Sequence, residues 1–124
     1  MEHRRHFSIE QANALRPWTA DRVERLRKLR TDLRGSELGP FAPLATASGG
    51  AWPGREHAQA IVHLQLTLEE LRRADIVIRD LDRGLIDFPA VRDGDEVYLC
   101  WLVGEPEIRH WHELESGFAA RRPL

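Results

Sequence analysis

The stretch that decides the fold is LIDFPAVRDGDEVYLCWLV, residues 85–103. Two β-rich runs flank Asp93-Gly94, which predicts a two-residue type I′ turn because such a turn needs positive φ at both central positions. Counting outward from the turn pairs Asp87 with Cys100, whereas a three-residue turn would shift this register. One face of the predicted hairpin is apolar and belongs to the core, with Ile86, Phe88, Ala90, Val97, Leu99 and Trp101. The other face is more polar, with Asp87, Pro89, Val91, Glu96, Tyr98 and Cys100.

Polar residues that follow the hairpin could join Asp87 and Cys100 in one site. Glu105 and His112 are the nearest in sequence, and His110 shares a face with His112 if that segment is extended. A thiolate, an imidazole and carboxylates suit a borderline-soft divalent metal such as zinc. We therefore predict a binding module for a divalent metal or a small polar ligand. The predicted ligands are Asp87, Cys100, Glu105 and His112, although the chain has no Cys-x-x-Cys and no His-Glu-x-x-His motif.

Two other interpretations of these residues stay open. In the first, Cys100 is a small buried apolar residue beside a hydrogen-bonded Asp87, and the polar cluster is structural. In the second, the protein is an enzyme that uses Cys100 as nucleophile and His112 as base. However, a carboxylate beside a thiol raises the thiol pKa unless a cation is present, and no oxyanion-hole motif is recognisable.

Helical periodicity precedes this sheet region. Ser8 followed by Gln11 predicts a capping box at the start of a helix that ends at Gly35. Pro17 lies inside this helix and predicts a kink or a short break near residues 15–17. A second helix is predicted at residues 55–75, where apolar residues recur at spacings of three and four. The two helices are expected to form an antiparallel hairpin over residues 8–75, with a long Gly- and Pro-rich loop at 35–54.

The predicted fold class is α+β, an N-terminal antiparallel helical hairpin followed by a small, mostly antiparallel β-sheet. The β-rich part covers residues 76–115. Besides the two runs of the hairpin, it contains a predicted strand at Ile76-Val77-Ile78 and a predicted extended segment at residues 108–114. A length of 124 residues fits a single domain, residues 1–124.

Composition narrows the classes of function. Hydrophobic residues make up 42% and charged residues 31% of the chain, which is typical of a globular protein rather than a disordered one. A single cysteine excludes an internal disulfide framework and favours the reducing cytoplasm. No apolar run reaches the length of a membrane span, and the N-terminus lacks the apolar core of a signal peptide. Charges alternate in sign along the first helix, which indicates a solvated face and argues against nucleic-acid binding.

The predicted helices also indicate a partner. Each helix carries more apolar surface than the other helix would cover, so the remainder packs on the sheet or on another subunit. The alternative function is therefore a homodimeric interaction protein that associates through its helical hairpin. In that case the C-terminal polar cluster is structural.

Several motifs resemble one family. These are FSIEQANALRP at residues 7–17, DLDRGLIDFP at residues 80–89, Leu99-Cys-Trp, Gly104-Glu105, Trp111-His112, Gly117-Phe118 and Arg121. They are similar to the uncharacterised prokaryotic domain-of-unknown-function family 2203 over nearly the whole chain, least so at residues 35–54. The resemblance implies a small bacterial protein of helices plus sheet, and it supplies no activity, cofactor or catalytic residue. Asp87, Cys100, Glu105 and His112 all lie inside these motifs.

Overall fold

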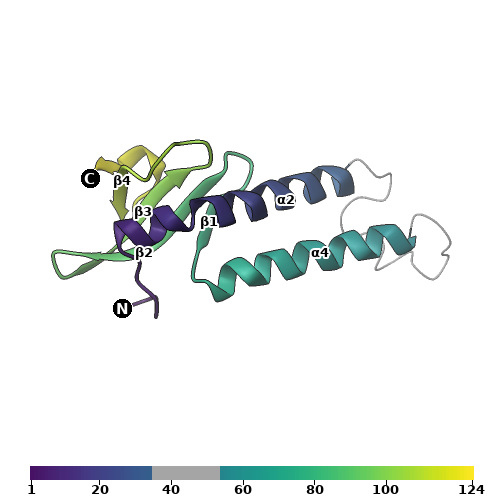
Figure 1. Ribbon diagram of the computed structural model, residues 1–124, viewed down its shortest axis with the longest axis horizontal. Helices are drawn as coiled ribbons and strands as arrows, with labels where there is room; N and C mark the ends of the chain where they lie inside the picture. The colour runs from purple at the N-terminus through teal and green to yellow at the C-terminus, as the bar shows by residue number, and fades with distance from the viewer. Residues whose placement is uncertain (35–53) are drawn as a thin grey trace.

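The computed structural model describes residues 1–34 and 54–124, and over these residues helices precede an antiparallel sheet (Figure 1). The helices are α1 (Ile9–Ala14), α2 (Arg16–Arg34) and α4 (Gly54–Arg73). The strands are β1 (Val77–Asp80), β2 (Leu85–Arg92), β3 (Asp95–Leu102), β4 (His110–Glu113) and β5 (Arg122–Pro123), with a 3-10 turn at Phe118–Ala120 before β5. The predicted α+β class is confirmed. Apart from Gly54, the loop predicted at residues 35–54 lies outside the described residues.

The first predicted helix is divided into two. Ser8 caps α1, because its side chain accepts the backbone N–H of Gln11 while the Gln11 side chain accepts the backbone N–H of Ser8. The helix α1 ends at Ala14 with Leu15 as its C-cap, and α2 begins at Arg16. Pro17 is the second residue of α2, where the backbone N–H that proline lacks would have no partner within the helix. The predicted break is confirmed, and the described helical part has three helices where two were expected.

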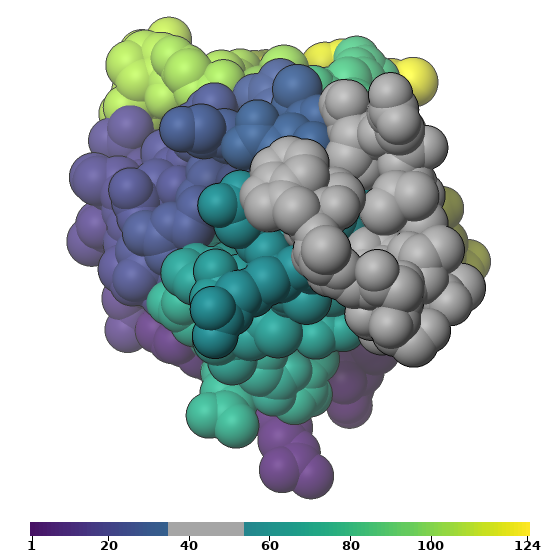
Figure 2. All heavy atoms as spheres, turned by 90° about the vertical axis from the view of Figure 1, so that its right-hand side faces the viewer, coloured from purple at the N-terminus to yellow at the C-terminus, as the bar shows by residue number. Residues whose placement is uncertain are grey.

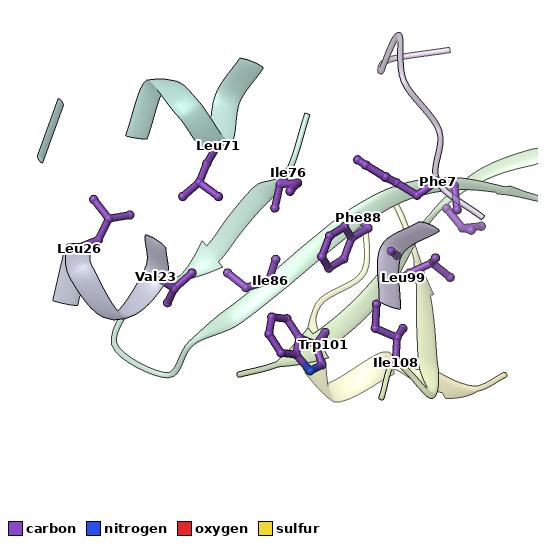
Figure 3. Packing of buried hydrophobic residues seen from close by; sticks show 13 residues of the cluster. Phe7, Val23, Leu26, Leu71, Ile76, Ile86, Phe88, Leu99, Trp101 and Ile108 are labelled. Atoms are coloured by element: carbon purple, nitrogen blue, oxygen red, sulfur yellow. The ribbon is translucent and has the colours of Figure 1, made fainter. Parts of the chain in front are cut away.

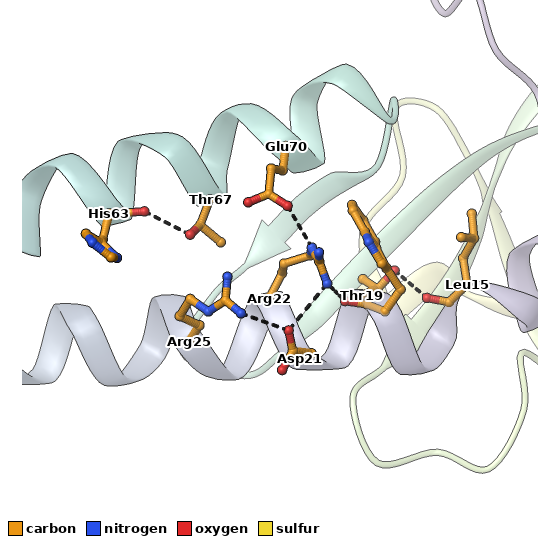
Figure 4. Close-up of polar contacts among 9 residues, drawn as sticks. Leu15, Thr19, Asp21, Arg22, Arg25, His63, Thr67 and Glu70 are labelled. Atoms are coloured by element: carbon orange, nitrogen blue, oxygen red, sulfur yellow. Dashed lines mark hydrogen bonds and ion pairs between the residues drawn. The ribbon is translucent and has the colours of Figure 1, made fainter.

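The helices α2 and α4 lie side by side (Figures 1 and 2). Arg22 of α2 donates through Nε to Glu70 of α4 at 3.0 Å, and its guanidinium stacks over the Trp18 ring at 4.0 Å. Asp21 pairs with Arg22 and with Arg25, so neighbouring charges of α2 neutralise one another (Figure 4). Within residues 1–34 and 54–124, we find no helix long and apolar enough to cross a membrane.

Every strand of the sheet pairs with the strand that precedes or follows it in sequence, in the order β1-β2-β3-β4-β5. Asp93 and Gly94 have φ values of 52° and 85°, as a type I′ turn requires. The register runs from Arg92 opposite Asp95 to Asp87 opposite Cys100 and beyond. The predicted hairpin pairing is thus confirmed. The extended segment predicted near residues 108–114 is β4, whereas the short strand β5 was not predicted.

The apolar face of this sheet packs against the helices (Figure 3). Phe88 is fully buried at the centre, with the Phe7 ring at 5.4 Å and the Trp101 ring at 6.5 Å between centroids. Leu26 of α2 and Leu71 of α4 belong to the same cluster. The helices therefore cover the face that carries Trp101, and the predicted polar side chains lie on the opposite face of the sheet.

Candidate metal centre

The structure brings three of the four predicted ligands together. Asp87 from β2, Cys100 from β3 and His112 from β4 have ligand atoms that all lie within 4.8 Å of one another. The register explains the meeting, since Asp87 is opposite Cys100, and His112 is opposite Tyr98, which lies two residues from Cys100 on the same face of β3. All three side chains are buried, with exposed fractions of 0%, 0% and 1%. The polar face of the sheet is therefore enclosed at this point.

Both ring nitrogens of His112 face acceptors. Nε2 lies 3.0 Å from each carboxylate oxygen of Asp87, and Nδ1 lies 2.7 Å from the backbone carbonyl oxygen of Glu113. A neutral imidazole has one N–H, so it can donate to only one of these two groups. If Nδ1 donates to Glu113, the lone pair of Nε2 points at a carboxylate. This arrangement needs a positive charge between them, supplied by a second ring proton or by a metal ion.

Cys100 has the chemistry of an unactivated thiol. Burial, together with the negative charge of Asp87, raises the pKa of Cys100 to about 11. The guanidinium of Arg121 acts in the opposite direction, with Nη1 at 4.0 Å from Sγ, but it does not outweigh burial. Catalytic cysteines have lowered pKa values. The geometry of the described residues does not provide the activation that the predicted nucleophile would need.

Glu105 lies outside the group formed by the other three predicted ligands. Its Oε1 accepts the backbone N–H of Leu102 at 2.8 Å, and its Oε2 accepts from Nη2 of Arg121 at 2.7 Å. Burial opposes the charged carboxylate, but Arg121 and the Leu102 amide outweigh it and lower the pKa of Glu105. Glu105 thus closes the turn after β3, and Arg121 connects it to the edge of the Cys100 site.

Two arginines beside the cluster were not predicted as site residues. Arg79 of β1 donates through Nε to Oδ2 of Asp87 at 2.9 Å. Val77 is opposite Asp87, and Arg79 lies at the irregularity that follows in β1, from which its side chain reaches the same carboxylate. Arg121 also donates to Nδ1 of His110 at 2.8 Å. It reaches the site through the turn at Phe118–Ala120, for which the sequence carries no periodic signal.

The N-terminal residues border the same face. Tyr98 packs its ring 5.5 Å from the ring of His112, and its hydroxyl lies 2.6 Å from Nε2 of His3. Glu96 accepts from the backbone N–H of His3 and lies 2.5 Å from Nε2 of His6. Burial opposes the charge of Glu96, yet these hydrogen bonds outweigh it and lower the pKa of Glu96 to about 2. No pattern in the sequence predicts that these N-terminal histidines lie near the site.

The fold and the site define a small α+β protein with a buried carboxylate, thiol and imidazole on three adjacent strands. Over residues 5–124 the chain matches the family described as "Uncharacterized conserved protein (DUF2203)", and it belongs to that family. The predicted resemblance is confirmed. No curated protein and no solved structure matches the chain.

Proposed function

We propose that this protein is a binding module for a divalent transition metal ion held by Asp87, Cys100 and His112. Zinc suits these donors best, because it accepts carboxylate, thiolate and imidazole ligands in four-coordinate sites. Zinc bonds of about 2.0–2.3 Å place ligand atoms roughly 3–4 Å apart. Since the three ligand atoms already lie within 4.8 Å of one another, side-chain movements of about 1 Å complete the site.

The observation that carries the proposal is the bonding of His112. Metal-bound histidines commonly donate their second ring N–H to a backbone carbonyl or a carboxylate, which fixes the tautomer and the ring orientation. The Nδ1 contact with the Glu113 carbonyl at 2.7 Å has this form. It directs the Nε2 lone pair towards Asp87 and Cys100, where a cation balances their negative charge.

A structural cluster is the competing interpretation. In it, His112 carries protons on both nitrogens and forms an ion pair with Asp87, while Cys100 keeps its thiol proton. The two interpretations differ in their proton count, because metal binding displaces both the Nε2 proton and the thiol proton. Zinc is added to the protein in a calorimeter, in buffers of different ionisation enthalpy. A metal site is expected to release protons as zinc binds, whereas a purely structural cluster binds no zinc and releases none.

The direct experiment is elemental analysis of untagged protein by inductively coupled plasma mass spectrometry. Near-stoichiometric zinc or another transition metal is expected in the parent protein. It should fall strongly in Cys100→Ser, which is nearly isosteric, and in His112→Ala. His63→Ala is the control, because His63 is exposed on α4 and is not in the ligand group. Circular dichroism checks that each variant is folded.

Two results would overturn the proposal. One is a parent protein that holds no metal, as isolated and after dialysis against zinc. The other is metal that persists unchanged in folded Cys100→Ser and His112→Ala protein. Loss of metal in the control variant to the same degree as in His112→Ala would also refute the assignment of ligands.

A second candidate function is homodimerisation through the helices, which the apolar surface of α4 supports. Val62 and Leu66 lie one turn apart on α4, with exposed fractions of 49% and 60%. Exposed apolar neighbours of this kind mark contact surfaces more often than isolated ones do. Sedimentation equilibrium should then show a dimer that Leu66→Glu dissociates, and a monomer at micromolar concentration would remove this candidate.

A further inference from the structure

Arg79 connects the buried cluster to solvent. Its Nε lies 2.9 Å from Oδ2 of Asp87, whose side chain is 0% exposed, while the side chain of Arg79 is 37% exposed. Its guanidinium lies over the Tyr98 ring, 4.9 Å from the centroid, and this contact keeps it beside the cluster. Nε is used by Asp87, and the guanidinium also interacts with the Tyr98 hydroxyl. An arginine has five N–H donors, so further Nη donors are left for a ligand.

Arg121, the other arginine beside the cluster, already forms an ion pair with Glu105. Arg121 is bound by Glu105 at 2.7 Å, and their side chains are 13% and 27% exposed. Their charges cancel, and the Arg121 guanidinium also donates to His110. This pair therefore adds little net charge to the site.

A bound metal would change the charge balance around Arg79. A divalent cation is neutralised by the carboxylate of Asp87 and the thiolate of Cys100, and His112 adds a neutral ligand. Before metal binding, Asp87 balances Arg79. After metal binding, the Asp87 charge is committed to the metal, and Arg79 has no second carboxylate among its ion pairs in the described residues. The metal, its three ligands and Arg79 together then carry one positive charge.

The coordination number of the metal also favours an exogenous anion. A structural zinc site has four protein ligands, whereas a site with three protein ligands takes its fourth from solution. In the part of the chain that the structure describes, the ligand group holds only three side chains of the His, Cys, Asp and Glu types. The fourth position thus belongs to an exogenous group, and the local charge favours an anion.

We infer that the metal centre binds a small oxyanion, of the carboxylate or phosphate class, as its fourth ligand and that Arg79 is the second anchor of this anion. This inference rests on the proposed metal site. Arginine suits the role because its planar N–H fork matches two oxygens of a carboxylate or phosphate. Because the three ligand side chains are buried, the anion reaches the metal only when the side chains around the cluster move aside, and the exposed part of Arg79 marks the side of entry. One oxygen then bonds the metal while another accepts from a guanidinium Nη.

Cobalt substitution tests this arrangement, since the visible spectrum of bound Co²⁺ reports directly on its ligands. Cobalt-loaded protein is titrated with inorganic phosphate in one series and with acetate in another. A saturable spectral change is expected with at least one of them. Arg79→Gln should weaken this binding about tenfold or more, as loss of a hydrogen bond between charged groups does. Arg79→Lys keeps the charge, stays folded and should bind with intermediate affinity.

Arg109→Gln is the control, because Arg109 is exposed and pairs only with Glu107 among the ion pairs of the described residues. Protein that takes up no cobalt refutes the metal site itself. Protein that binds cobalt but gives no saturable change with either anion overturns the inference and leaves the metal site standing. Equal weakening in Arg79→Gln and Arg109→Gln, or extraction of cobalt by phosphate with no change from acetate, also overturns it.

Discussion

The thiol of Cys100 permits a quantitative test of the electrostatics of the cluster. Iodoacetamide reacts with the thiolate, so the alkylation rate follows the ionised fraction. Burial and the charge of Asp87 raise the pKa of Cys100 from the ordinary value of 9.0 to about 11. This rise of about two pH units lowers the thiolate fraction near neutral pH about 100-fold. Metal-free folded protein should therefore be alkylated at least about 100 times more slowly than free cysteine.

The assay follows the added mass by mass spectrometry in metal-free protein at several pH values. The rate should rise about tenfold for each pH unit up to about pH 10, because the thiolate fraction does so below the pKa. Protein unfolded in guanidinium chloride is the control and should react like free cysteine. A rate for the folded protein within about tenfold of free cysteine would refute the reasoning. It would also restore Cys100 as a candidate nucleophile with His112 as base.

Three further predictions concern stability, each measured by urea denaturation. Phe88→Ala removes a fully buried ring and should lower the free energy of unfolding by about 3–5 kcal/mol; a loss below about 1 kcal/mol would contradict the packing. Ser8→Ala deletes the α1 cap and should cost about 1 kcal/mol, whereas Ser8→Asp, which retains a cap, should cost little. Gly84→Ala should destabilise more than Gly94→Ala. Both glycines have positive φ, but only at Gly84 would an added Cβ contact Val103, at 3.2 Å. Equal losses of unfolding free energy in the two variants would show that this contact with Val103 does not contribute.

The sequence predicts the hairpin well because two independent signals agree there. Asp93-Gly94 defines the turn, and alternation of apolar and polar residues defines the faces, so the position of every side chain follows. The pairing of Asp87 with Cys100 can be predicted from these two signals alone. His112 was predictable too, since an extended β4 beside β3 places it on the same face.

The remaining site residues depend on geometry that no local pattern encodes. Arg79 sits at an irregularity in the pairing of β1 with β2, so its reach to Asp87 cannot be counted from the turn. Arg121 is placed beside the cluster by a 3-10 turn. His3 is placed there by hydrogen bonds to residues more than 90 positions away in sequence. Glu105 was predicted as a ligand from its proximity in sequence. Its Oε1 instead accepts the backbone N–H of Leu102 in the turn after β3, and its Oε2 accepts from Arg121.

The neighbour-to-neighbour order of the strands has a consequence for how the protein folds. Because β1 to β5 pair in sequence order, most sheet contacts join residues close along the chain, and such contacts form early. Asp87, Cys100 and His112 belong to three consecutive strands. These strands can therefore bring the three side chains together before the N-terminal segment binds, which it does through the Phe7 backbone N–H and the Pro89 carbonyl. We expect hydrogen exchange during refolding to protect β2 and β3 first. A nascent chain would then complete its ligand set only after β4 has been synthesised.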